Sequence, residues 1–341
     1  MSVLSLNGRP PLPVHHAVAP RHTALNRAIM SENSPAAPSA IESAISSTMT
    51  PRKPRDSELD VYGMTHVGNL RQTNQDHFII SSLRRDVVVH QTSLPPAESQ
   101  STTERLALLA VVADGVGSSL MGGEASRQAV EGILNYVSAC TKCFYRLEEG
   151  DDRELHDALS DAAMRVHADI AKERADGPPE ARGMATTLTV WLGVWPYAYL
   201  LQVGDSRCYV LRGGVLTQIS RDQTIVQDLV DAGVLTRTQA MRSPLNNVLS
   251  SAIGGEEAMP VVTRMESSWD TVGLLCSDGL TKHVSDERIA ERLRTMTSAR
   301  QACEALVQDA LDAGGSDNIT VVIGRPTPNK VEHPLLHASV R

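Results

Sequence analysis

The stretch Leu106-Ala-Leu-Leu-Ala-Val-Val-Ala-Asp114-Gly115-Val-Gly117 decides the fold. Its apolar part has the length of a buried strand, and it ends abruptly in an aspartate followed by a glycine. A strand that ends in this way leaves a carboxylate at the rim of a sheet, while the glycine lets a ligand or another backbone segment come close. We therefore expect a buried strand that carries an acidic functional residue at its end.

Four more aspartates have a similar setting. Asp205, Asp278 and Asp317 lie next to glycines or small residues beside strand-like runs, and Asp76 precedes another such run. A single Asp-Gly pair usually marks a turn, but five aspartates at strand ends are harder to explain as turns. Like charges gathered at one rim repel one another, and a bound cation relieves that repulsion. Oxygen ligands of this kind favour Mg²⁺ or Mn²⁺.

The order of the predicted elements indicates the fold class. Strand patterns occur in hairpin-sized groups, such as 207–211 and 215–219 on either side of Gly213-Gly214. Amphipathic helical patterns occur in pairs, near 124–145 with 155–170 and near 286–294 with 299–313, and a further helix is predicted over 224–240. This order predicts an α+β fold with antiparallel sheets rather than an alternating parallel sheet.

The chain divides into three parts by composition. Residues 1–56 contain eight of the eighteen prolines and no sustained apolar period, so we predict a disordered N-terminal extension. A catalytic domain is predicted over 57–325. Residues 326–341 form a short C-terminal tail.

Composition also excludes several classes of function. The net charge of −8 and the aromatic share of 3% argue against a nucleic-acid partner. No apolar run is long enough for a membrane helix, and an odd set of five cysteines is not a disulfide framework. Cys140 and Cys143 have the spacing of a zinc or redox pair but lack a second pair, so we interpret all five as reduced thiols of a cytoplasmic protein.

Six short motifs surround the aspartates and the polar residues near them. They are Arg71-x-x-Asn74-Gln75-Asp76, Val112-Ala113-Asp114-Gly115-Val116-Gly117, Gly183-Met184-Ala185-Thr186-Thr187, Val203-Gly204-Asp205-Ser206-Arg207, Cys276-Ser277-Asp278-Gly279-Leu280 and Gly315-Ser316-Asp317-Asn318-Ile319-Thr320. Together they resemble the metal-dependent PPM (PP2C-type) family of protein serine/threonine phosphatases in its bacterial form, in the order and spacing of that family over about residues 60–325.

The resemblance implies a central antiparallel β-sandwich flanked by pairs of α-helices, with a site for two Mg²⁺ or Mn²⁺ ions at one end. By position, Asp114 would bridge both metals, and the carbonyl group of Gly115 would bind one of them. The other members of the implied metal site are Asp278 and Asp317 in the second metal's shell, Asp76 on metal-bound water, and Asp205 at a third, weaker metal. Arg71 would bind the substrate phosphate, so Arg71, Asp76 and Asp114 are the expected catalytic residues.

The expected reaction is hydrolysis of phosphoserine and phosphothreonine by direct attack of a metal-bridging hydroxide, which would reverse the action of a cognate bacterial kinase. The expected partners are that kinase and phosphorylated proteins, and the expected state is a monomer. Two alternatives stay open: a pseudophosphatase or phosphoprotein-binding module on the same fold, and a metal phosphohydrolase that acts on small molecules. Arg207 follows Asp205, and we expect it to orient that carboxylate through a salt bridge. His66 and His283 are weaker candidates for a general acid.

Overall fold

A computed structural model describes residues 52–87, 91, 102–116, 120–139, 152–240 and 242–328. All of them belong to one unit, Thr50–Arg341. Most of the predicted N-terminal extension, most of the predicted C-terminal tail, and the pair Cys140 and Cys143 lie outside the described residues. The three-part division of the chain therefore stays a prediction for residues 1–51 and 329–341.

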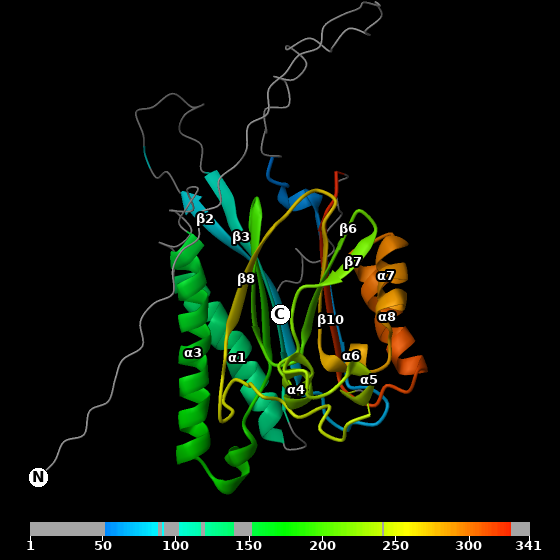
Figure 1. Cartoon of the computed structure of the whole chain (residues 1–341). Coiled ribbons are helices and arrows are strands. Elements are labelled where there is room, and N and C mark those ends of the chain that lie inside the picture. The colour runs from blue at the N-terminus through cyan, green and yellow to red at the C-terminus, as the bar shows by residue number, and fades with distance from the viewer. Residues whose placement is uncertain are drawn as a thin grey trace, which may run out of the picture. The chain divides into compact units, whose positions relative to one another are not determined.

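Two antiparallel five-stranded sheets form the centre of the described region (Figure 1). The first sheet has the order β1-β10-β9-β6-β7, and the second has the order β2-β3-β4-β5-β8. In chain order, the strands are β1 (Leu59–His66), β2 (Asp76–Val87), β3 (Thr102–Asp114), β4 (Leu188–Val194), β5 (Tyr197–Val203), β6 (Arg207–Arg212), β7 (Val215–Gln218), β8 (Val261–Glu266), β9 (Val272–Cys276) and β10 (Ile319–Pro326).

Helices cover the outer face of each sheet, which gives four layers. In Figure 1, α1 and α3 lie against the sheet that contains β2 and β3, while α7 and α8 lie against the sheet that contains β10. The helices are α1 (Leu120–Ala139), α3 (Asp152–Asp176), α4 (Ile225–Asp231), α5 (Arg237–Ala240), α6 (Asp278–Thr281), α7 (Asp286–Arg294) and α8 (Ala299–Asp312), with 3-10 turns η1 (Asp56–Glu58) and η2 (Pro179–Gly183). The predicted α+β sandwich with paired helices is confirmed.

The alternation of side chains along β3 explains the layers. Leu109, Val111 and Ala113 point to the core shared with α1 and α3. Ala110 and Val112 point the other way, into a smaller core between the two sheets. Because both faces of β3 are buried, its sequence is a continuous apolar run rather than an alternating one.

Two predictions of secondary structure were wrong. The single helix predicted over 224–240 is broken into α4 and α5, because Gly233 adopts a left-handed conformation with φ of 71°. Strand β8 was missed, although its side chains alternate between exposed and half-buried along most of its length. It pairs with β5 at the edge of its sheet, and its apolar residues, Val261, Val262 and Met265, do not alternate with its polar ones.

The N-terminal boundary of the folded region also differs from the prediction. Residues 52–56, which we assigned to the extension, pack on the domain. The guanidinium group of Arg105 donates to the carbonyl oxygen of Pro54 at 2.6 Å and to the carboxylate of Asp56 at 2.5 Å. Arg105 is a buried charge, with 8% of its surface exposed, and this segment supplies its partners.

Candidate active site

The five predicted aspartates lie at the same end of the two sheets. Asp76 is the first residue of β2 and Asp114 is the last residue of β3, and the two are paired in register. Asp205 lies in the turn between β5 and β6. Asp278 begins α6 directly after β9, and Asp317 lies in the loop before β10. Antiparallel strands bring these chain segments to one rim, as the sequence predicted.

Asp114 is at the centre of this carboxylate cluster. Its burial raises its pKa well above the usual range, and the charges of Asp76, Asp278, Asp205 and Asp317 raise it further. All four other aspartates are therefore close enough to act on Asp114. The repulsion that we expected between clustered carboxylates is present in the folded chain.

Asp76 and Asp205 have raised pKa values for the same main reason. Burial raises the pKa of Asp76 to about 6, although Thr320 and Ser277 donate hydrogen bonds to its Oδ2 atom at 2.7 and 2.8 Å and oppose the shift. Burial and the charge of Asp278 raise the pKa of Asp205 to about 7. Both groups thus hold a proton more readily than an exposed aspartate does.

Two basic side chains balance part of this charge. Lys282 Nζ lies 2.6 Å from Asp278 Oδ2 and 2.8 Å from Asp317 Oδ2. Arg71 Nε lies 2.8 Å from Asp317 Oδ1. Burial alone would raise the pKa of Asp317, but the hydrogen bonds from Lys282 and Arg71 hold it below its usual value. Lys282 was missed in the sequence, where its only signal was its position four residues after Asp278 on a helix.

Glycine is required beside two of the aspartates because other backbone segments pass close by. A Cβ atom on Gly115 would lie 2.4 Å from the backbone of Gly122, and one on Gly279 would lie 1.9 Å from the carbonyl oxygen of Asn318. Neither position has room for a side chain. The Asp-Gly pairs are thus places where the backbone packs tightly beside an acidic group.

Asn318 holds the loop that carries Arg71, and this role was not expected. Its Nδ2 atom donates to the carbonyl oxygens of Val67 and Thr73 at 2.9 and 3.0 Å. Its Oδ1 atom accepts from the backbone of Gln75 at 2.8 Å. These three bonds fix both ends of the loop, so Asn318 is a positioning residue for Arg71.

Other polar residues near the site make structural contacts. Arg207 pairs with Asp222, with Nη2 2.7 Å from Oδ2, so the expected salt bridge from Arg207 to Asp205 was wrong. His283 Nε2 accepts a hydrogen bond from the backbone of Ser316 at 2.9 Å, and His66 Nδ1 accepts one from Gly68. These bonds occupy one ring nitrogen of each histidine.

The donor set fits divalent cations. Asp76 Oδ1 and Asp278 Oδ1 are buried without a hydrogen-bond partner, so each has lone pairs directed into the protein with nothing to satisfy them. Within the described ranges, no group of three His, Cys, Asp or Glu residues already has the arrangement of a metal site. Instead, the positively charged groups of Lys282 and Arg71 form ion pairs with carboxylate oxygens of this cluster. The chemistry of the ligands suits Mg²⁺ or Mn²⁺, provided that Lys282 gives way.

A family model described as Protein phosphatase 2C matches residues 97–313. The chain belongs to this family. The family expected from the six motifs is thus confirmed, and the match covers β3–β9 together with helices α1 and α3–α8.

Relatives in the protein phosphatase 2C family come from several bacteria. The chain is 37% identical over 229 residues to the serine/threonine protein phosphatase PstP of Mycobacterium tuberculosis, which covers 67% of this chain but only 42% of that protein. It is 32% identical to the serine/threonine phosphatase stp of Listeria monocytogenes, over 63% of this chain and 83% of that protein. The crystal structure of the PstP catalytic domain with two manganese ions matches with a TM-score of 0.60 at 30% identity, over 79% of this chain and 98% of that one.

No helix in the described part of the chain is both long enough and apolar enough to cross a bilayer.

Proposed function

We propose that this chain is a metal-dependent protein serine/threonine phosphatase, which hydrolyses phosphoserine and phosphothreonine and so reverses the action of a kinase. The observation that carries the proposal is the cluster of five aspartates around Asp114, with two buried oxygen atoms that lack partners. The names of the Mycobacterium and Listeria relatives support the choice of phosphorylated proteins as substrates.

The residues that would hold two Mg²⁺ or Mn²⁺ ions are Asp114, the carbonyl group of Gly115, Asp278 and Asp317. Asp205 would contribute to a third, weaker ion, and Asp76 would hold metal-bound water. When bound, these ions supply an activated water and neutralise negative charge on the phosphoryl group. Family membership and the manganese ions of the PstP structure support this assignment.

The chain's own side chains have separate tasks. Arg71 is 42% exposed at the rim of the cluster, so its guanidinium can reach a phosphate dianion and bind two of its oxygens. Asp76 is held in place by Ser277 and Thr320 through one oxygen, which leaves the other to accept a hydrogen bond from water. The pKa of Cys276 is raised to about 12 by burial, so this thiol stays protonated and is a poor nucleophile. We therefore propose direct hydrolysis without a covalent phosphoenzyme.

The deciding experiment compares the wild-type chain with Asp114→Asn. We expect turnover of a phosphothreonine peptide and of p-nitrophenyl phosphate in Mn²⁺, no turnover in EDTA, and none by the variant. Binding of the phosphopeptide without turnover in Mn²⁺ would instead favour a pseudophosphatase or binding module. Faster hydrolysis of nucleotides or sugar phosphates than of any phosphopeptide in a panel would favour a small-molecule phosphohydrolase.

The identity of the kinase, the monomeric state and the cytoplasmic location stay predictions. Measurement of the molecular mass in solution tests the monomeric state, and cell fractionation tests the cytoplasmic location. Three buried cysteines in the described region, Cys208, Cys276 and Cys303, are free thiols.

A further inference from the structure

A cavity lies between the two sheets, at the end away from the carboxylate cluster. The strands that line it in both sheets continue to the aspartates: β3 runs from Leu108 at the cavity to Asp114, and β9 runs from Gly273 to the start of α6 at Asp278. The cavity offers about 110 Å³ to the centres of water-sized molecules. One water needs only about 10–15 Å³ on this measure, so the cavity has room for a group much larger than a water molecule.

The cavity exists because the inward-facing positions at this end carry glycine where a core would carry larger side chains. Gly273 of β9 and Gly324 of β10 are partners in the first sheet, and Gly193 lies on β4 in the second sheet. A Cβ atom on Gly273 or Gly324 would approach no other atom closer than 3.5 Å. Packing therefore does not require glycine at these two positions, and their effect is to leave the space open.

Two of the three tryptophans of the chain line this cavity, and the third packs against one of them. Trp191 and Trp195 lie two positions to either side of Gly193 along β4 and the following turn, and both line the cavity. Trp269 packs edge to face against Trp195, with ring centroids 6.3 Å apart. The aromatic share of the whole chain is only 3%, so this concentration of indole rings marks the cavity as a place for a flat apolar body.

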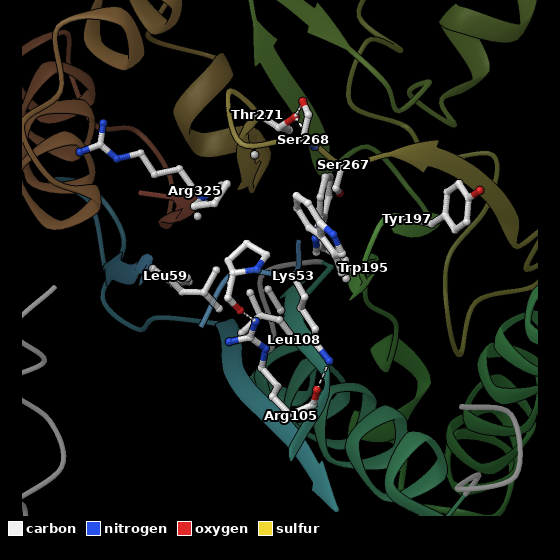
Figure 2. Close-up of a pocket in the computed structure, with 18 of the residues that line it drawn as sticks. Lys53, Leu59, Arg105, Leu108, Trp195, Tyr197, Ser267, Ser268, Thr271 and Arg325 are labelled. Atoms are coloured by element: carbon white, nitrogen blue, oxygen red, sulfur yellow. Dashed lines mark hydrogen bonds between the residues drawn. The ribbon is translucent and has the colours of Figure 1, made fainter. Parts of the chain in front are cut away.

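Lys53 supplies a positive charge beside these rings. Lys53 and Trp195 both line the cavity (Figure 2), and the Nζ atom of Lys53 donates to the carbonyl oxygen of Arg105. The ion pair of Lys53 with Glu104 is long, with Nζ 3.9 Å from Oε1. Arg105, in contrast, contacts the carboxylate of Asp56 directly. Lys53 is thus bonded to a backbone carbonyl oxygen, and an anionic group on a ligand would add a closer charged partner.

We propose that this cavity binds a planar aromatic carboxylate. The ring system would lie between the sheets against Trp191 and Trp195, and the carboxylate would accept a hydrogen bond from Lys53. The proposal does not depend on phosphatase activity, since none of its residues belongs to the carboxylate cluster.

The test uses 2-naphthoate as the probe and the full chain as the protein. Isothermal titration calorimetry should show saturable binding at one site, with much weaker binding of 2-naphthamide, which has the same rings without the charge. The indole N–H signals of Trp191 and Trp195 in a ¹⁵N–¹H correlation spectrum should shift with the same saturation curve, because both rings line the cavity. Binding to the folded state should also raise the melting temperature.

Two variants and one control locate the probe. Lys53→Met should weaken 2-naphthoate binding about tenfold, as expected for loss of one charge-assisted hydrogen bond. Gly324→Leu should fill the cavity and abolish binding, and its melting temperature shows whether it is folded. Lys172→Met removes an exposed lysine on α3 and should leave binding unchanged.

Three results would overturn the proposal. The first is absence of saturable binding at millimolar 2-naphthoate. The second is equal binding of 2-naphthoate and 2-naphthamide, which would remove the role of Lys53. The third is unchanged binding by folded Gly324→Leu, which would place the probe elsewhere on the protein.

Discussion

Arg71 and Asp317 form a two-pronged ion pair at the rim of the carboxylate cluster, with Nε 2.8 Å from Oδ1 and Nη2 2.9 Å from Oδ2. The two residues are far apart in the chain, and each lies in a loop that leads into a strand. The guanidinium that we propose for phosphate binding is therefore already oriented by a carboxylate that we propose for metal binding. When a substrate and a cation bind, Arg71 would contact the phosphate and Asp317 would contact the cation, in place of the contact between the two residues.

Replacement of Arg71 by alanine should mainly weaken substrate binding. Loss of a bidentate charge-assisted contact should lower kcat/KM by about 10- to 100-fold, chiefly through a higher KM. Inhibition by free phosphate should weaken in parallel. Arg71→Lys keeps the charge but loses the paired geometry, so its kinetics should be intermediate. Identical kinetics of wild type and Arg71→Ala would show that Arg71 pairs with Asp317 and does not bind the substrate.

Replacement of Lys282 by methionine should tighten the binding of Mn²⁺. The ammonium group contacts two of the proposed ligands, Asp278 and Asp317, so a divalent cation must displace it. We expect an apparent Kd for Mn²⁺ about tenfold lower in calorimetry, and a lower melting temperature in EDTA because the carboxylates lose their counter-ion. Weaker Mn²⁺ binding by this variant would mean that Lys282 supports the site instead of competing for it.

Asp309 should stabilise the α7–α8 pair in a pH-dependent way. Arg292 and Arg288 both bind its carboxylate, and the hydrogen bonds from Arg292, followed by those from Arg288, lower its pKa to about 2. Because the folded pKa lies below the unfolded value of about 4, this stabilisation is complete above pH 4 and is lost as the pH falls towards 2.

Urea unfolding of Asp309→Asn measures this effect. The variant should lose about 1 kcal/mol of unfolding free energy at pH 7, and the loss should shrink at pH 3. Asp312→Asn, at an exposed position on the same helix, is the control and should change little. An equal loss for Asp309→Asn at both pH values would rule out the ion pairs as its cause.

Two N-terminal truncations should separate the predicted extension from the packed segment. Residues 1–51 lack the apolar period that packing requires, so a chain that begins at Arg52 should keep its melting temperature and its turnover of p-nitrophenyl phosphate. A chain that begins at Ser57 also loses Pro54 and Asp56, and it leaves the buried charge of Arg105 without these partners. It should lose about 3 kcal/mol of stability. Equal stability of the two truncations would contradict the role given to residues 52–56.

The elements that the sequence predicted are those with strong local patterns. The apolar run before Asp114 has the length of a buried strand and ends at an Asp-Gly pair, and the paired stretches have the apolar period of amphipathic helices. The prediction of one helix over 224–240 failed because Gly233 adopts a left-handed conformation that ends α4. A single glycine is compatible with both helical and left-handed backbone, so the sequence does not distinguish them. Strand β8 was missed because its apolar residues do not alternate with its polar ones, so it lacks the period of a half-buried strand.

The sequence by itself determined the antiparallel α+β class, the helix pairs and the five aspartates at strand ends, because these features follow from apolar periodicity and turn residues within short stretches. The sandwich was implied by the resemblance to the family. Only the tertiary structure decided that Lys282 and Arg71 share Asp317, that Arg207 pairs with Asp222 rather than Asp205, and that glycines and tryptophans enclose a cavity. Most of these contacts join residues from different strands and loops. Such a contact depends on how whole sheets and helices pack together, and no local pattern in the chain records that packing.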